Sequence, residues 1–272
     1  MRTSWKLGQF AGIDCYVHPT LFLVLAYVLA FNGGILSMAL VGAAFGCVLL
    51  HELGHSLMAR RFGIETEDIT LYPIGGIARL RRLPKAPGVE LAIAVAGPAV
   101  NVAIAVVLGL FLFATPLLDG SELLRVFALN LMVVNGLLAA FNMIPAFPMD
   151  GGRVLRAVLS GWFGRQRATS IAANLGRLLA VLYGTYNLVL FLTGSSDSSL
   201  MQILLATFIY FAAGNELRSV EAEERGGRGQ GGGGELNTPP GFRWVSRGNG
   251  LWQLAPIIVE SGPGRRPSSP WR

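Results

Sequence analysis

Long apolar stretches, separated by short polar segments, make up most of the first 217 residues of this chain. A helix needs about 20 mainly apolar residues to cross the hydrocarbon of a membrane. Six stretches are candidates: Tyr16–Phe31, Ile35–Ala59, Val89–Pro116, Leu123–Phe147, Ile171–Thr193 and Leu200–Gly214. The first and the last are the shortest. The pattern predicts an all-α polytopic membrane protein with about six transmembrane helices.

The composition agrees with this reading. Hydrophobic residues make up 52% of the chain, and Asp, Glu, Lys and Arg together only 14%. An average soluble domain has about 25% charged residues. So few charges cannot cover the surface of a water-soluble globule of this size, and the composition excludes a soluble Rossmann-type domain, a disordered chain and collagen.

The basic residues predict the orientation, because cytoplasmic loops are enriched in Lys and Arg. They fall before the first stretch, in alternate connections and after the last stretch: Arg2, Lys6, Arg60, Arg61, Arg79, Arg81, Arg82, Lys85, Arg153, Arg156, Arg165, Arg167 and those of the tail. The connections Asn32–Gly34, Leu117–Glu122 and Gly194–Ser199 carry none. We therefore expect a multi-pass protein of the cell (inner) membrane with both termini in the cytoplasm. The net charge of +6 then has a membrane explanation, and we expect no nucleic-acid partner.

Two segments differ from the apolar stretches. Thr66–Leu80 is rich in β-favouring residues and is interrupted by Pro and Gly, which predicts a small β-hairpin-like cytoplasmic insertion after the second helix. After a membrane domain of residues 1–217, residues 218–241 have the Glu, Arg and Gly composition of a flexible linker. Residues 242–272 form a short tail in which Asn249-Gly250 favours the turn of a hairpin.

The second stretch carries His51-Glu52-Leu53-Gly54-His55 near its cytoplasmic end. On a helix, residues four apart share a face, so both imidazoles can reach one metal ion. Glu52 projects beside that ion, where it can act on a water molecule. This is the arrangement of zinc proteases, in which two histidines hold the metal and the carboxylate is the general base.

A zinc ion needs a third protein ligand from the same side of the membrane. Asp119 and Glu122 lie in an outer connection, and Glu90 is on the correct side but in no recognisable pattern. Asp150 returns to the depth of His55, after a fourth stretch that starts at the outer face. Asp150 is therefore the candidate for the third ligand that the topology favours.

The surroundings of Asp150 support this choice. Pro145 and Pro148 interrupt the helix, and Gly151-Gly152 allow close approach of the backbone. Unwound backbone at membrane depth is tolerated only where protein buries it or where it lines a water-filled cavity. An acidic residue in such a break is a good candidate for a ligand.

These residues closely resemble the site-2 protease family of intramembrane zinc metalloproteases. The family combines HExxH in one membrane helix with NxxPxxPxDG in a later one, which correspond here to His51–His55 and Asn142–Gly151, followed by Gly152. Gly97–Asn101 and Tyr72–Gly76 also look like family segments. The family usually has Leu where this chain has Met149, a change that leaves the ligand untouched. The resemblance covers about residues 8–215.

The resemblance implies an intramembrane zinc metalloendopeptidase that cleaves membrane-anchored protein substrates in or near their transmembrane segments. It implies one Zn²⁺ per chain, with His51, His55 and Asp150 as ligands and Glu52 as the catalytic acid and base. For Asn101 and Asn142 two roles stay open: they donate to the developing oxyanion, or they tie helices together. A catalytically silent membrane scaffold that binds zinc or client helices is the alternative function. His18, the only other histidine, is expected to have a capping or interfacial role.

Overall fold

A computed structural model describes residues 4–31, 34–81, 84, 86–114, 122–194, 200–231, 242–246 and 252–256. The chain divides into two compact units, Met1–Val220 and Glu221–Arg272. The first unit holds the apolar helices and every predicted site residue.

Seven helices make up most of the described residues. Six of them lie wholly in the first unit, and the seventh begins in it. They are α1 (Thr20–Phe31), α2 (Gly34–Arg61), α3 (Pro87–Ala114), α4 (Glu122–Asn142), α5 (Asp150–Phe163), α6 (Arg165–Leu192) and α7 (Leu200–Gly231). Five of them, α2, α3, α4, α6 and α7, are long and apolar enough to cross a membrane. The prediction of a mostly helical, polytopic membrane protein is therefore confirmed.

The predicted boundaries need two corrections. The first apolar stretch does not start at Tyr16, which lies in a strand; its helix α1 has only 12 residues and is short for a span. The fourth span does not reach Phe147, because α4 ends at Asn142 and the two prolines follow. In both cases an apolar run continues past the end of the helix, so hydropathy alone overestimates the helix length.

Strands β1 (Trp5–Phe10), β2 (Ile13–Val17), β3 (Thr66–Tyr72) and β4 (Gly75–Leu80) form one sheet in this order. The hairpin predicted for Thr66–Leu80 is confirmed as the antiparallel pair β3–β4. Strands β1 and β2 were not predicted. Strand β2 runs parallel to β3, so the first strands of the chain extend the hairpin into a four-stranded sheet.

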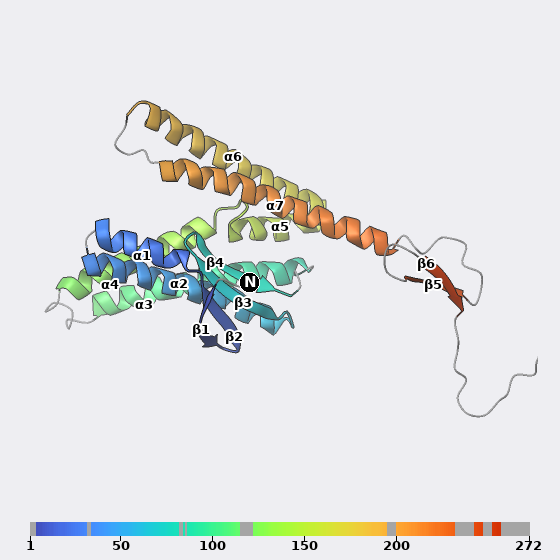
Figure 1. Cartoon of the computed structure of the whole chain (residues 1–272), viewed down its shortest axis with the longest axis horizontal. Helices are drawn as coiled ribbons and strands as arrows, with labels where there is room; N and C mark the ends of the chain where they lie inside the picture. The colour runs from blue at the N-terminus through green and yellow to red at the C-terminus, as the bar shows by residue number, and fades with distance from the viewer. Residues whose placement is uncertain are drawn as a thin grey trace, which may run out of the picture. The chain divides into compact units, whose positions relative to one another are not determined.

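The sheet is attached to α2 through apolar side chains. Ile13 and Cys15 of β2, Ile69 of β3 and Leu53 of α2 form a buried cluster. Leu53 lies between the two histidines of α2, so this cluster holds the sheet beside the predicted metal ligands. Figure 1 shows α1–α4 grouped together, with the four strands at one end of the group.

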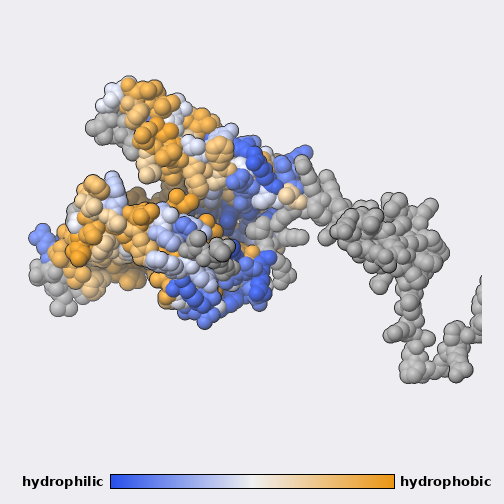
Figure 2. All heavy atoms as spheres, viewed as in Figure 1, coloured by the Kyte–Doolittle hydropathy of each residue, from blue (hydrophilic) through white to orange (hydrophobic). Residues whose placement is uncertain are grey.

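Hydrophobic and hydrophilic residues separate along the first unit. Figure 2 shows hydrophobic residues gathered over the helix ends that lie away from the sheet, and hydrophilic residues around the strands and the opposite ends of the helices. Phe113 near the end of α3 and Leu192 at the end of α6 are 86% and 75% exposed. Large apolar side chains with such exposure are expected where a helix faces lipid.

The break between α4 and α5 is held by neighbouring helices. Phe147 is fully buried, and its backbone N–H donates to the carbonyl of Ala172 in α6 at 3.2 Å. The guanidinium of Arg156 lies 4.8 Å from the centre of the Phe147 ring. These contacts place Asp150 at the first position of α5.

The last helix continues past the predicted end of the membrane domain. Residues 218–231, predicted as part of a flexible linker, extend α7 to Gly231. In the tail, β5 (Phe242–Ser246) and β6 (Trp252–Pro256) pair antiparallel. The turn predicted at Asn249-Gly250 lies outside the described residues. The division into domains stays a prediction.

Candidate metal centre

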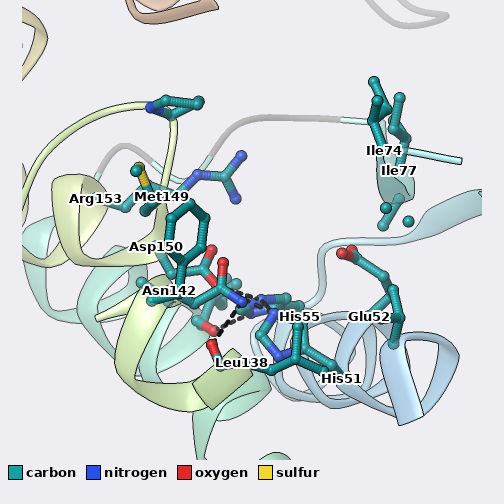
Figure 3. Close-up of a pocket in the computed structure, with 18 of the residues that line it drawn as sticks. His51, Glu52, His55, Ile74, Ile77, Leu138, Asn142, Met149, Asp150 and Arg153 are labelled. Atoms are coloured by element: carbon teal, nitrogen blue, oxygen red, sulfur yellow. Dashed lines mark hydrogen bonds and ion pairs between the residues drawn. The ribbon is translucent and has the colours of Figure 1, made fainter. Parts of the chain in front are cut away.

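Two histidines and one aspartate meet at the end of α2. His51 and His55 lie one turn apart on α2 and are 5% and 6% exposed. Their Nε2 atoms are 3.0 Å apart, and each is 3.1 Å from Oδ2 of Asp150. Figure 3 shows the three side chains converging from two elements, α2 and α5. The structure thus brings together the three residues that the sequence suggested as ligands.

The dimensions of this triangle suit a divalent ion. Zinc lies about 2.0–2.1 Å from imidazole nitrogen and carboxylate oxygen, so the ligand atoms of a tetrahedral site are separated by about 3.3 Å. The three edges observed here are 3.0, 3.1 and 3.1 Å. Two imidazoles and a carboxylate are also a donor set that zinc accepts, with a fourth position left open. The residues therefore fit a catalytic zinc ion.

A backbone carbonyl of α3 orients one of the imidazoles. Nδ1 of His55 donates to the carbonyl of Ile93 at 2.7 Å, which leaves Nε2 as the ring nitrogen that can ligate a metal. Nδ1 of His51 is buried and has no hydrogen-bond partner among the described residues. Ile93 was not predicted, since a carbonyl can play this role in any residue type.

Gly97, one turn further along α3, brings the backbone close to both histidines. A Cβ atom at this position would lie 2.2 Å from Nε2 of His55 and 2.7 Å from Nε2 of His51. Only glycine leaves room for the imidazoles in this geometry. The segment Gly97–Asn101 resembles the family in sequence, but the sequence does not reveal this contact with the histidines.

Asp150 is 8% exposed and is the first residue of α5. Burial would raise the pKa of its carboxyl, but the hydrogen bonds with His51 and His55, together with the charges of His55 and Arg153, bring the pKa below its ordinary value. The N-terminus of a helix also favours a negative charge. The carboxylate is thus held in the ionised form that a metal ligand requires.

Glu52 shares a cavity with the triangle but points elsewhere. The cavity has a volume of about 490 Å³, and its walls include the triangle, strand β4 and parts of α3 to α5 and α7. A Cβ atom at Gly76 of β4 would lie 2.5 Å from Cγ of Glu52, so the strand packs directly on this side chain. Figure 3 shows the carboxylate turned toward Ile74 and Ile77 of the hairpin rather than toward the histidines.

The two candidate asparagines differ in their bonding. Both line the cavity. Nδ2 of Asn142 donates to the carbonyl of Leu138 at 3.0 Å, within its own helix. Asn101 is fully buried, and neither atom of its amide has a hydrogen-bond partner among the described residues. Both N–H groups of the Asn101 amide are therefore uncommitted at the cavity wall, whereas one of the two N–H groups of Asn142 is engaged.

A buried ionic network that the sequence pattern does not predict lies beside the triangle. The pattern places Arg156 in a connection between spans, but in α5 this residue is only 2% exposed. Its Nε donates to Oε1 of Glu90 in α3 at 2.6 Å, its Nη2 pairs with the same oxygen, and its Nη1 donates to Glu216 of α7 at 2.9 Å. Glu90 is thus an ion-pair partner and lies outside the triangle. The available signal was Glu90, a charged residue inside an apolar stretch.

His18 takes no part in the triangle. Its Nδ1 lies 2.7 Å from Oγ1 of Thr20, the first residue of α1, and its ring stacks on Tyr72 at 5.1 Å. The side chain therefore connects the start of α1 with the end of β3. This position agrees with the capping role expected for it.

Comparisons with known proteins agree with the geometry of this site. The model of peptidase family M50 matches residues 39–119 and 119–183. The chain is 40% identical over 227 residues to the zinc metalloprotease MJ0392 of Methanocaldococcus jannaschii, a match that covers 82% of this chain and 63% of the relative. It is 32% identical to the putative zinc metalloprotease sll0528 of Synechocystis, with 83% and 62% covered.

A solved structure is also similar. The site-2 protease from Methanocaldococcus jannaschii matches with a TM-score of 0.58 and 37% identity, over 79% of this chain and 95% of that chain. This chain spans a little less than two thirds of the length of the two sequence relatives.

Proposed function

This chain belongs to peptidase family M50, and from that membership we propose that it is a zinc metalloprotease of the membrane. Its substrates are membrane-anchored proteins, which it cleaves in or near their transmembrane segments. Its similarity to a zinc metalloprotease and to a site-2 protease supports the chemistry. The five long apolar helices support the membrane location.

The observation that carries the proposal is the triangle of His51, His55 and Asp150, with Glu52 in the same cavity. In this proposal, the three residues hold one Zn²⁺, which when bound acts as a Lewis acid toward the peptide carbonyl. Glu52 accepts the proton of the attacking water on its carboxylate and returns it to the leaving amine. To do so, the carboxylate must rotate from the hairpin toward the triangle.

We assign the oxyanion contact to Asn101 rather than Asn142. A donor that stabilises the developing oxyanion must be able to point its N–H groups into the cavity. Both N–H groups of the Asn101 amide are uncommitted among the described residues, whereas one N–H of Asn142 is bonded to Leu138, which holds that amide along its own helix. Asn142 would then serve to hold the end of α4 at the start of the break.

The substrate backbone is proposed to pair with β4. Strand β4 is at the edge of the sheet, with β3 as its neighbour, and residues Gly75–Ala78 line the cavity. An unpaired strand edge binds an extended peptide through main-chain hydrogen bonds. A peptide bond inside a helix is shielded, so such pairing would hold the substrate open for attack.

The proposal includes an orientation. The hydrophilic end of the first unit, which carries the sheet, would face the cytoplasm, and both termini would lie on that side. The cut would then fall in the cytoplasmic half of the substrate's transmembrane segment. The membrane itself is proposed to be the cell membrane.

A cleavage assay tests the proposed activity. The purified chain in detergent is incubated with a panel of single-span substrates, beside a Glu52→Gln variant and a sample treated with a zinc chelator. We expect cleavage by the native chain alone, restored after chelation by added zinc. Cleavage that persists in Glu52→Gln would overturn the assigned mechanism. Zinc binding without cleavage of any substrate would favour the alternative, a silent membrane scaffold.

A further inference from the structure

Arg153 is a charged side chain of the cavity that the proposed mechanism does not use. It lies one turn after Asp150 on α5 and is partly buried. Figure 3 shows its guanidinium extending from α5 into the space that faces Ile74 and Ile77. It therefore stands on the wall opposite the hairpin, beside the path of a peptide that reaches the triangle.

The two arginines of α5 differ in their partners. Arg156 is paired with the carboxylates of Glu90 and Glu216. Arg153, in contrast, forms no hydrogen bond or ion pair with any of the residues that the structure describes. A guanidinium has five N–H donors and keeps its charge in proteins. Partly desolvated charges of this kind are normally paired.

The carboxylates nearest to Arg153 are committed elsewhere. Four acidic residues act on it electrostatically: Asp150, Glu216, Glu52 and Glu90. Asp150 is bonded to the two histidines, and Glu90 and Glu216 are bonded to Arg156. Glu52 lies against Gly76 on the opposite wall. The cavity thus contains a fixed positive charge without a direct partner of its own.

A peptide can offer this group two kinds of acceptor, a main-chain carbonyl or a carboxylate. Both accept hydrogen bonds, but only a carboxylate also neutralises the charge, and charge-assisted bonds are roughly twice as strong as neutral ones. The planar guanidinium matches a carboxylate in a bidentate geometry. Arg156 shows that this part of the fold satisfies a guanidinium with carboxylates.

We propose that Arg153 is a substrate-binding residue that recognises a carboxylate close to the scissile bond. The carboxylate is either an Asp or Glu side chain of the substrate or the new C-terminal carboxylate of the product. This inference rests on the proposed function, since a protease brings both kinds of group into the cavity. If Arg153 binds in this way, either the preference for an acidic residue in the substrate or the affinity for the product should depend on the Arg153 side chain.

Binding measurements in a non-cleaving background test the proposal. The Glu52→Gln protein carries either Arg153 or one of the variants Arg153→Gln, Arg153→Lys and Arg153→Glu. Fluorescent single-span peptides carry one Asp, moved stepwise through the cytoplasmic half of the span, and each is compared with its Asn twin. A second set ends at successive positions of the same stretch, as the C-terminal acid or the amide. Arg167→Gln, an exposed arginine of α6, is the matched control.

We expect one position at which the acid binds roughly tenfold or more tightly than its neutral twin. The ratio should fall to about one in Arg153→Gln, persist in Arg153→Lys and in the Arg167→Gln control, and fall below one in Arg153→Glu, where the acid meets a like charge. A preference in the Asp set assigns a substrate side chain, and one in the truncated set assigns the product carboxylate. An acid preference that survives Arg153→Gln, or its absence in both sets, would overturn the proposal.

Failure of this inference can be told apart from failure of the proposed function. The same peptides are incubated with the protein that retains Glu52. Cleavage without any dependence on Arg153 contradicts the carboxylate site and leaves the protease intact. Binding that depends on Arg153 without cleavage supports the carboxylate site and contradicts the protease.

Discussion

Gly97 of α3 lies so close to His55 of α2 that a Cβ atom added to it would stand 2.2 Å from the imidazole Nε2. The imidazole cannot easily retreat, because its Nδ1 is bonded to the carbonyl of Ile93 in the same helix α3. The backbone of α3 thus forms one wall of the candidate metal centre. The imidazoles can lie against this wall only because residue 97 is a glycine and has no side chain.

Substitution of Gly97 by alanine should therefore weaken metal binding. The new methyl group would displace both imidazoles, and we expect zinc affinity to fall by at least the roughly 10- to 100-fold that is typical for loss of an outer-shell contact. Competition with a chromogenic chelator measures the affinity. Gly88→Ala, in the same helix with nothing within 4 Å of the new Cβ, is the control and should bind zinc like the native chain. Equal affinity in Gly97→Ala would contradict the geometry described above.

Substitution of Gly76 should affect catalysis and leave zinc binding unchanged. A Cβ atom there would lie 2.5 Å from Cγ of Glu52, so either the side chain or β4 must move. A displacement of about 1 Å in catalytic geometry can cost on the order of 100-fold in rate. We expect kcat of Gly76→Ala to fall by roughly 10- to 100-fold, measured on the best single-span substrate. A native rate in this variant would show that the contact does not position Glu52.

Alanine substitution of Asn101 and of Asn142 should lower kcat to different extents. If Asn101 donates to the oxyanion, Asn101→Ala should lower kcat by roughly 10²- to 10³-fold, the usual effect of removing one such donor. Asn142→Ala should have a smaller effect on kcat, since its amide bonds to Leu138 instead. Zinc affinity is measured in both variants to exclude a collapsed site. A larger loss of kcat in Asn142→Ala than in Asn101→Ala would reverse the assignment.

The ionic network of Arg156 should stabilise the fold. Arg156→Met leaves the buried Glu90 without its partner, and breaking such a pair typically costs about 3–5 kcal/mol. We therefore expect a lower midpoint of thermal unfolding in detergent. Glu216 is more exposed than Glu90, so Glu216→Gln should lower the midpoint less.

The double variant Arg156→Met/Glu90→Met provides a check on this explanation. It removes both buried charges. Its loss of stability should therefore be smaller than the sum of the losses measured for Arg156→Met alone and Glu90→Met alone. Strict additivity would mean that the two residues act independently, which would contradict the proposed pairing.

Local sequence properties were sufficient to predict much of the fold and part of the site. Hydrophobic length identifies α2, α3, α4, α6 and α7 as spans, because each of them can satisfy its own backbone hydrogen bonds without reference to the rest of the chain. The i, i+4 spacing of His51 and His55 places both imidazoles on one face of any helix. Strands β1 and β2 escaped prediction because β2 pairs with β3, about 50 residues away, and such partners leave no local pattern.

The sequence by itself determined an apolar helical protein with two histidines and a glutamate in one turn, since periodicity and hydropathy are properties of neighbouring residues. The sequence also indicated Asp150 as the third ligand, but only the tertiary structure decided how closely its carboxylate and Gly97 approach the two histidines. It also decided that Glu52 faces the hairpin, that Glu90 serves Arg156 and that Arg153 is left without a partner among the described residues. These relationships are distances between separate helices and strands, and the packing of the whole membrane unit sets them.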